Sequence, residues 1–286
     1  MDRRFRLVDV FGRRPLAGNP LAVVIDSEGL STEDMAEMTR WFDFSETSFL
    51  CPPASADADY RVRIFTPAGE LPFAGHPTLG SAHVWQTLAA DSRDEIVQEC
   101  GAGLVRLRRS GDLIAFEAPP LLRSGPVDPV ELERLVAVLG VQSEEVVAAR
   151  WVDNGPGWVG VLLRDAETVL GLEPDFTRYS GEERLEVGVV GMYPVGSEYS
   201  YEVRAFFTGA RGEMREDPVT GSLNASLAQW MLDEGLVEAP YLASQGARVG
   251  RTGRVHISSD DGGAVWVGGR VVDIVDGHCR GAGLYT

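Results

Sequence analysis

The stretch "YRVRIFTPAGELPFAGHPTLGS", residues 60–81, recurs in altered form later in the chain. It aligns without a gap on "YEVRAFFTGARGEMREDPVTGS", residues 201–222, at a constant offset of 141 residues. The identical positions cluster at both ends of the window: Tyr60/Tyr201, Val62/Val203, Arg63/Arg204, Phe65/Phe206, Pro77/Pro218, Gly80/Gly221 and Ser81/Ser222. Self-similarity at a fixed spacing indicates a repeated structural unit. We therefore predict two copies of one α/β unit.

Each copy has the pattern of a strand, a loop and a helix. Alternating side chains in residues 60–65 predict a strand, and a loop rich in glycine and proline leads into the helical sequence "HPTLGSAHVWQTLAA". A proline follows His76 in the first copy and Asp217 in the second, and proline suits the first helical turn. We expect His76 and Asp217 at equivalent positions, at or just before the helix starts. Thr220 is an alternative cap for the second helix.

The chain is long enough for two domains. It has 286 residues, 44% of them hydrophobic, so each half can bury a core of its own. Between the copies, residues 106–140 run from a Ser-Gly turn through four prolines to an amphipathic helix that ends at Gly140. We predict domains at 1–120 and 121–286, and a return of the last residues to the first domain is left open.

A single carboxylate, Glu46, lies within the aromatic stretch "WFDFSETSFLC", residues 41–51. The helical pattern of residues 31–42 precedes it, with Ser31 as the expected N-cap. Alternation then predicts a strand that carries Glu46 on one partly apolar face. At the offset of 141 residues Val187 stands opposite, so we expect no acidic counterpart. Desolvation would raise the pKa of such a carboxyl, which makes Glu46 a candidate general acid/base.

Composition restricts the kind of partner. The net charge is −17 and the pI is about 4.6, which disfavours nucleic acid and anionic membrane surfaces. No apolar stretch has the length of a membrane span. The cysteines Cys51, Cys100 and Cys279 are far apart and suit a reducing compartment. Neither a metal-ligand spacing nor a nucleotide-binding motif is present. We expect a cytoplasmic protein without metal or cofactor.

A duplicated pair of domains also predicts where a ligand binds. Two related domains placed face to face form a cleft, and their helix N-termini would point into it. Each helix start offers unpaired N–H groups and about half a positive charge, which favours an anion. We therefore expect a small anionic substrate, with His76 and Asp217 lining the cleft as groups that orient it or relay a proton.

Four motifs taken together carry a family resemblance. They are "FGRRPLAGNPLAVV" (11–24), "FSETSF" (44–49), "ELPFAGHPTLGSAHV" (70–84) and "EDPVTGS" (216–222). In this order they resemble the PhzF-like phenazine-biosynthesis isomerase family of the diaminopimelate-epimerase-like superfamily. The resemblance implies an α+β fold of two pseudo-symmetric domains, each a curved mixed β-sheet around a central helix. It also implies a cofactor-free site between the domains and a homodimer.

The resemblance assigns roles to individual residues. Glu46 is implied as the proton-transferring carboxylate, with His76 and Asp217 beside it as catalytic groups. The implied substrate-binding residues are Asn19, Gly75, Gly221, Ser222, Gln245 and Gly246. Local roles also explain some of these residues, because Asn19 fits a turn and Asp217 fits a helix cap. The loop after Gly246 departs from the family's usual Gly-Arg-Pro-Ser, since Thr252 follows Arg251.

The expected activity is a cofactor-independent isomerisation of a small, carboxylate-bearing cyclic substrate, such as trans-2,3-dihydro-3-hydroxyanthranilate. An amino-acid racemase or epimerase of the same fold is one alternative. Such enzymes commonly carry a thiol at each helix start, whereas this chain has His76 and Asp217 there. A second alternative is a small-molecule-binding protein that retains the fold without the chemistry.

Overall fold

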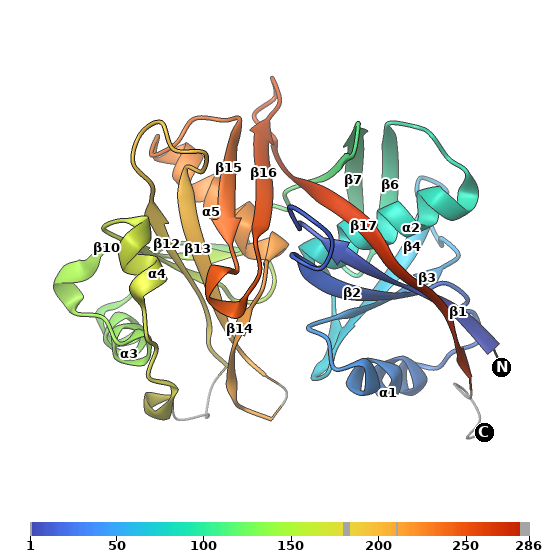
Figure 1. Ribbon diagram of the computed structural model, residues 1–286, viewed down its shortest axis with the longest axis horizontal. Coiled ribbons are helices and arrows are strands. Elements are labelled where there is room, and N and C mark those ends of the chain that lie inside the picture. Colours follow the sequence, from blue (N-terminus) through green and yellow to red (C-terminus); the bar gives the residue numbers. More distant parts are fainter. Residues whose placement is uncertain (1, 180–183, 210, 281–286) are drawn as a thin grey trace. The chain divides into compact units, whose positions relative to one another are not determined.

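The computed structural model describes residues 2–179, 184–209 and 211–280 (Figure 1). The chain divides into two compact units. The first contains the described residues up to Glu117 and again from Gly268, and the second spans Ala118–Val267. The chain passes between the units after Glu117 and again within its last strand. Each unit is described separately below.

The first unit is a mixed sheet that curves around one helix. Its elements are β1 (Asp2–Val10), β2 (Asn19–Val24), α1 (Thr32–Phe42), β3 (Thr47–Cys51), β4 (Tyr60–Thr66), β5 (Gly69–Leu71), α2 (Gly75–Ala89), β6 (Glu95–Cys100), β7 (Gly103–Ser110), β8 (Leu113–Glu117) and the part of β17 (Val265–Arg280) from Gly268. Pairing runs β17–β1–β2–β3–β4–β6–β7–β8, and β8 pairs with β17 again. Only β2–β3 and β4–β6 are parallel among these pairs whose direction is recorded.

Helix α2 occupies the inside of this ring of strands. It contacts β1, β2, β3, β4 and β8 (Figure 1). Its sequence is apolar or small on every side, which is typical of a helix that is buried all round. Small residues let it approach the sheet, because a Cβ on Gly80 would lie 2.4 Å from Leu21 Cδ2. The central helix is therefore specified by side-chain size as well as by hydrophobicity.

The second unit repeats this order of elements. It contains β9 (Arg123–Pro126), α3 (Pro129–Leu139), η1 (Ser143–Glu145), β10 (Val146–Asp153), β11 (Val159–Leu163), α4 (Ala166–Gly171), η2 (Phe176–Arg178), β12 (Glu186–Met192), β13 (Tyr201–Thr208), β14 (Met214–Asp217), α5 (Gly221–Asp233), β15 (Tyr241–Gln245), η3 (Ala247–Val249) and β16 (Gly253–Ser259). Antiparallel and parallel pairs follow one another as in the first unit, with β11–β12 and β13–β15 parallel. The predicted α+β architecture, a curved mixed sheet with a central helix in each copy, is confirmed.

The register of the strands defines which residues are equivalent. Thr47 pairs with Phe65 in the first unit, and Val187 pairs with Phe206 in the second. One ion pair occurs in both copies: Arg63 Nη2 lies 2.7 Å from Glu70 Oε2, and Arg204 Nη2 lies 2.7 Å from Glu216 Oε2. The list of equivalent elements is β2/β11, β3/β12, β4/β13, β5/β14, α2/α5 and β6/β15. The duplication thus extends well beyond the aligned window of sequence.

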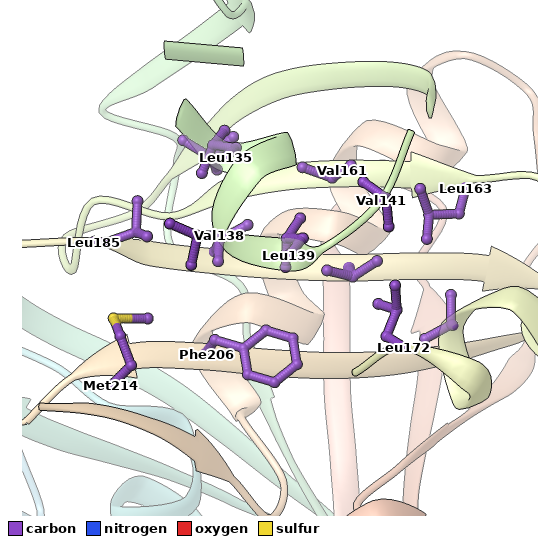
Figure 2. Close-up of a cluster of buried hydrophobic side chains, with 14 residues drawn as sticks. Leu135, Val138, Leu139, Val141, Val161, Leu163, Leu172, Leu185, Phe206 and Met214 are labelled. Carbon is purple, nitrogen blue, oxygen red and sulfur yellow. The ribbon is translucent and has the colours of Figure 1, made fainter. Parts of the chain in front are cut away.

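An apolar layer covers the outer face of the second sheet. Figure 2 shows Leu135, Val138 and Leu139 of α3 facing the β-strands that carry Val161 and Phe206. These residues are at most 1% exposed. Helix α3 begins at the N-cap Asp128, and its C-cap Gly140 has a φ of 70°. The amphipathic helix predicted to end at Gly140 is therefore confirmed. Because this layer fills the outer face, the polar residues on the opposite face of the sheet lie toward α5.

The helix starts differ from the prediction. Helix α2 begins at Gly75, so His76 lies inside its first turn, whereas Asp217 ends β14 and α5 begins only at Gly221. The reason is the length of the preceding hairpin: residues 67–68 connect β4 to β5, whereas residues 209–213 connect β13 to β14. A gap-free alignment cannot follow this difference. The expected equivalence of His76 and Asp217 is wrong.

Candidate active site

Glu46 lies between a helix and a strand of the first unit. Helix α1, with the predicted N-cap Ser31, ends at the left-handed residue Asp43 (φ 54°), and β3 begins at Thr47. The predicted strand is thus shorter than expected, because Glu46 precedes it. Phe49 packs into the apolar cluster under α1, and alternation puts Glu46 on the opposite face, toward α2. The Glu46 side chain is 16% exposed, so it is largely desolvated but accessible.

His76 brings an imidazole against this carboxylate. It is the second residue of α2 and is 2% exposed. Its Nε2 lies 3.6 Å from Glu46 Oε2. Burial lowers the pKa of His76 to about 3, although a hydrogen bond to the main chain of Pro20 opposes this effect. We therefore describe the contact as one between a carboxyl and a neutral imidazole, because desolvation outweighs a partner that is beyond hydrogen-bond distance.

The tautomer of His76 follows from its contacts. Pro20 has no N–H, so its carbonyl must accept the hydrogen bond from the imidazole. Within the described parts of the chain, Nε2 has no hydrogen-bond partner, which makes Nδ1 the donor. The side-chain amide of Asn19 also lies 3.4 Å from Nδ1. Nε2 is then an acceptor that faces Glu46, and it can stabilise a proton carried by the carboxyl group.

Asp217 belongs to a hydrogen-bonded cluster at the start of α5 in the second unit. Thr220, and not Asp217, is the N-cap residue of this helix. The Thr220 hydroxyl donates to Asp217 Oδ2 over 2.6 Å. Asp217 is 6% exposed, so it is a buried carboxylate attached to the cap rather than the cap itself. The capping role predicted for Asp217 is therefore wrong, and the alternative cap, Thr220, is confirmed.

Gln245 ties the same cluster to β15. Its Nε2 donates to the Asp217 carbonyl and to Thr220 Oγ1, and its Oε1 accepts from the Thr220 N–H and from Asn224 Nδ2, all within 2.8–3.1 Å. These four bonds use the full capacity of a side-chain amide. At 1% exposure, Gln245 has the contacts of a residue that positions Asp217 and the start of α5.

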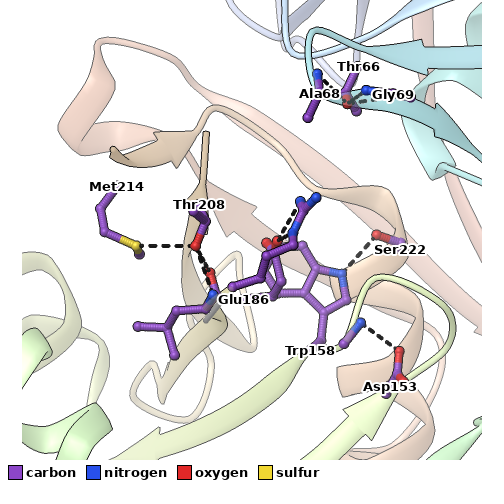
Figure 3. A network of polar contacts seen from close by, with 12 residues as sticks. Thr66, Ala68, Gly69, Asp153, Trp158, Glu186, Thr208, Met214 and Ser222 are labelled. Atoms are coloured by element: carbon purple, nitrogen blue, oxygen red, sulfur yellow. Dashed lines mark hydrogen bonds and ion pairs between the residues drawn. The ribbon is translucent and has the colours of Figure 1, made fainter. Parts of the chain in front are cut away.

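Ser222 lies in the first turn of α5, at the position equivalent to His76. Figure 3 shows the indole of Trp158 donating to Ser222 Oγ, over 3.1 Å. Asn154 Nδ2 donates to the Ser222 carbonyl over 2.8 Å. Both central helices begin with a glycine, Gly75 or Gly221, and neither start has a side-chain cap among the described residues. Their first N–H groups therefore have the chemistry of an anion site.

Gly246 holds the turn that follows Gln245. Its φ is 99°, a left-handed value that favours glycine, and a Cβ there would lie 2.5 Å from the Pro218 carbonyl oxygen. The backbone of this turn thus packs directly behind the residues that precede α5. Its glycine has a packing reason that is independent of any ligand.

The structure groups the predicted site residues by unit. Glu46 and His76 come together in the first unit, with Asn19 and Gly75 next to the imidazole. In the second unit the start of α5 brings together Asp217, Gly221, Ser222, Gln245 and Gly246.

One acidic residue was missed by the sequence alignment. Glu186 precedes Val187 as Glu46 precedes Thr47, and the two strands have the same register with their neighbours. Glu46 therefore has an acidic counterpart, and the expectation that it has none is wrong. The offset in this part of the chain is one residue shorter than in the aligned window, so Glu186 fell beside the position that we compared. A search of adjacent offsets would have found it.

Two further classes of site are not seen in the part of the chain that the structure describes. No group of three or more His, Cys, Asp or Glu side chains there is arranged to hold a metal ion. No helix in the same residues is long and apolar enough to span a membrane.

Comparisons with known proteins agree with this fold and with an isomerase. The chain is 32% identical to trans-2,3-dihydro-3-hydroxyanthranilate isomerase of Pseudomonas aeruginosa, over 96% of this chain and 98% of that protein. It is also 32% identical to Antisense-enhancing sequence 1 of Schizosaccharomyces pombe, with the same coverage. The solved structure of a predicted epimerase from Pseudomonas aeruginosa matches with a TM-score of 0.76 and 25% identity, over 98% of this chain and 99% of that one.

These similarities define an enzyme of the isomerase class with an epimerase-like fold. Residues 8–277 match the family model described as phenazine biosynthesis-like protein, and the chain belongs to this PhzC-PhzF family. The predicted family is confirmed.

Proposed function

We propose that this protein is a cofactor-independent isomerase that moves a proton on a small, carboxylate-bearing cyclic substrate, with Glu46 as the general acid/base. In this reaction Glu46 takes a proton from a ring carbon next to a conjugated system. The electrons of the broken C–H bond move through that system, and Glu46 returns the proton to another ring carbon on the same face. The first candidate substrate is trans-2,3-dihydro-3-hydroxyanthranilate, the compound named for the Pseudomonas relative.

The contact between Glu46 and His76 carries the proposal. A general acid/base must hold a proton and release it without a stable ion pair that fixes its charge. Glu46 is largely buried, and its neighbour is an imidazole whose acceptor nitrogen lies 3.6 Å away. By contrast, Arg184 Nη2 lies 2.9 Å from the equivalent carboxyl of Glu186. The neutral partner is what favours Glu46 as the proton carrier.

The remaining roles in the proposal concern binding. In the first unit, the N–H groups at Gly75 and the amide of Asn19 support binding of the substrate's polar groups. In the second unit, Asp217, Ser222 and the N–H groups at Gly221 are proposed to contact substrate, and Gln245 and Gly246 to keep these residues in place. Helix N-termini favour anions, which agrees with a substrate that bears a carboxylate.

Proton exchange in heavy water tests the proposal. The protein is incubated with trans-2,3-dihydro-3-hydroxyanthranilate in D2O, and deuterium incorporation and conversion are followed by NMR. We expect conversion by the wild type and a loss of at least about 100-fold with Glu46→Gln, because removal of a general acid/base typically costs 10²–10⁴-fold. Glu37→Gln, an exposed change on α1, is the matched control.

The same experiment separates the alternatives. Unchanged conversion by Glu46→Gln would refute the role of Glu46. A racemase or epimerase would show exchange of an amino acid with loss of optical activity. A binding protein would show saturable binding of the substrate with no exchange.

A further inference from the structure

Glu186 is a buried carboxyl on the inner face of the second sheet. Cross-strand neighbours share a face, and the register puts Gly188, Ala205 and Asp217 in one row. A Cβ on Gly188 would lie 2.4 Å from Leu223 of α5, so this row faces the central helix. Glu186 lies two residues before Gly188 and therefore points to the same face. It is 6% exposed.

The surroundings of Glu186 combine one guanidinium with one carboxylate. Arg184 donates to Oε1 from Nε (3.2 Å) and from Nη2 (2.9 Å), and Figure 3 marks this contact. Asp217 is close enough to interact electrostatically with Glu186. Arg215 occupies the same cross-strand row on β14, where its Nε lies 2.7 Å from Glu213.

The other elements packed against Glu186 contribute no charge at this place. On β13 its neighbour is Phe207. On the other side Trp158 precedes Val159, which pairs with Val187. At the start of α5, Ser222 accepts the hydrogen bond from Trp158. Among the described residues, the charge of this face therefore depends on Arg184, Asp217 and Glu186 itself.

We propose that Glu186 is a positioning residue: its uncharged form permits a carboxylate ligand to bind at the start of α5, and its ionisation weakens that binding. This inference rests on the proposed function, which requires an anionic substrate there. Asp217 already provides one negative charge on this face. A second carboxylate would repel an incoming carboxylate, while the neutral acid does not.

The ionisation of Glu186 falls in a useful pH range. Burial raises the pKa of Glu186 to about 7, the Arg184 guanidinium opposes this shift, and Asp217 adds to it. Below pH 7 the carboxyl group is mostly protonated, and above pH 7 it is mostly charged. Substrate affinity should therefore fall as the pH rises through this value.

Binding to a variant that does not turn over substrate tests the proposal. The dissociation constant of trans-2,3-dihydro-3-hydroxyanthranilate is measured by calorimetry with Glu46→Gln at pH 6 and pH 8. We expect binding to be about fivefold weaker at pH 8, the effect of one added charge several ångströms away. In Glu46→Gln/Glu186→Gln this pH dependence should disappear, because glutamine resembles the protonated acid.

Two further variants distinguish this effect from a structural one. Arg184→Gln changes an exposed residue, and loss of its guanidinium should move the weakening of binding to higher pH. Glu202→Gln is the matched control, since Glu202 is also buried on a strand of this unit but shares the outer face with Arg204. Combined with Glu46→Gln, it should leave the pH dependence unchanged.

The outcomes separate the two proposals. Binding that is equally tight at pH 6 and pH 8, or a pH dependence that survives Glu186→Gln, overturns the role of Glu186 alone. Absence of binding at both pH values rejects the proposed substrate, and the role of Glu186 with it. Loss of the pH dependence in Glu186→Gln together with an upward shift in Arg184→Gln supports the inference.

Discussion

Glu46 Oε2 lies 3.6 Å from His76 Nε2, and the imidazole is held uncharged in the first turn of a buried helix. The Pro20 carbonyl fixes the tautomer from the other side of the ring. The pair therefore consists of one group that carries a proton and one that accepts a hydrogen bond from it. Charge stabilisation by His76 is not required for this arrangement.

His76→Phe should lower kcat about 100-fold and change KM much less. The phenyl ring fills a similar volume but cannot accept a hydrogen bond from Glu46 or donate one to Pro20. Steady-state conversion of trans-2,3-dihydro-3-hydroxyanthranilate measures both constants. His83→Phe is the control, because His83 lies later on α2, where its Nε2 contacts Asp273 at 3.1 Å. Equal kcat values for His76→Phe and wild type would contradict a role for the imidazole.

His76 should also make the protein sensitive to acid. Its pKa is about 3 in the folded chain and near 6.5 when unfolded, so the unfolded state binds more protons between these values. The free energy of unfolding should therefore be unaffected by this group above pH 6.5 and fall by up to about 5 kcal/mol toward pH 3. Urea unfolding at pH 7 and pH 4 measures the loss. It should be smaller in His76→Phe, and an identical loss in both proteins would argue against a buried neutral imidazole.

Gln245→Ala should destabilise the start of α5. The side chain makes four hydrogen bonds to Asp217, Thr220 and Asn224, and truncation leaves buried polar groups without a partner. We expect a loss of about 2–4 kcal/mol in urea unfolding, together with a rise in KM from displacement of Asp217. Gln229→Ala, which removes one bond to the Pro119 carbonyl, should cost about 1 kcal/mol. Comparable losses in the two variants would show that Gln245 has no special positioning role.

The sequence predicted the duplicated fold because equal strands repeat equal patterns. Tyr60–Phe65 and Tyr201–Phe206 occupy the same strand in each unit, and the arginine in each forms the same ion pair. The alignment failed where the connections differ in length. Residues 209–213 form a longer hairpin than residues 67–68, so the helix starts moved out of register.

The candidate site was predicted less evenly. The resemblance pointed to Glu46 and His76, which the structure places in contact. Glu186 was missed because one residue of difference in offset replaces a glutamate with a valine in the comparison. The hydrogen-bonding role of Gln245 could not be read from sequence either, since it depends on how β15 runs beside β13.

Gly246→Ala should be strongly destabilising for steric reasons. A Cβ would clash with the Pro218 carbonyl oxygen at 2.5 Å, and the φ of 99° is strained for alanine. We expect a loss of about 2–4 kcal/mol, measured by thermal or urea unfolding. Gly171→Ala is the control, because a Cβ there meets no atom within 4 Å and Gly171 lies at the end of α4. A change below about 0.5 kcal/mol in Gly246→Ala would show that the turn adapts.

Glu186→Gln should have a pH-dependent effect on stability opposite in sign to that of His76. The pKa of Glu186 is about 7 in the folded chain and near 4.5 when unfolded, so the folded state binds more protons between these values. The stability of the wild type should therefore fall as the pH rises from 4.5 to 7, by up to about 3 kcal/mol. Glutamine cannot ionise, so Glu186→Gln should gain stability over wild type between pH 4.5 and pH 8 in urea unfolding. Glu37→Gln, exposed on α1, should follow the wild type at both values. A stability difference between wild type and Glu186→Gln that is the same at pH 4.5 and pH 8 would mean that the carboxyl group is not buried in its neutral form.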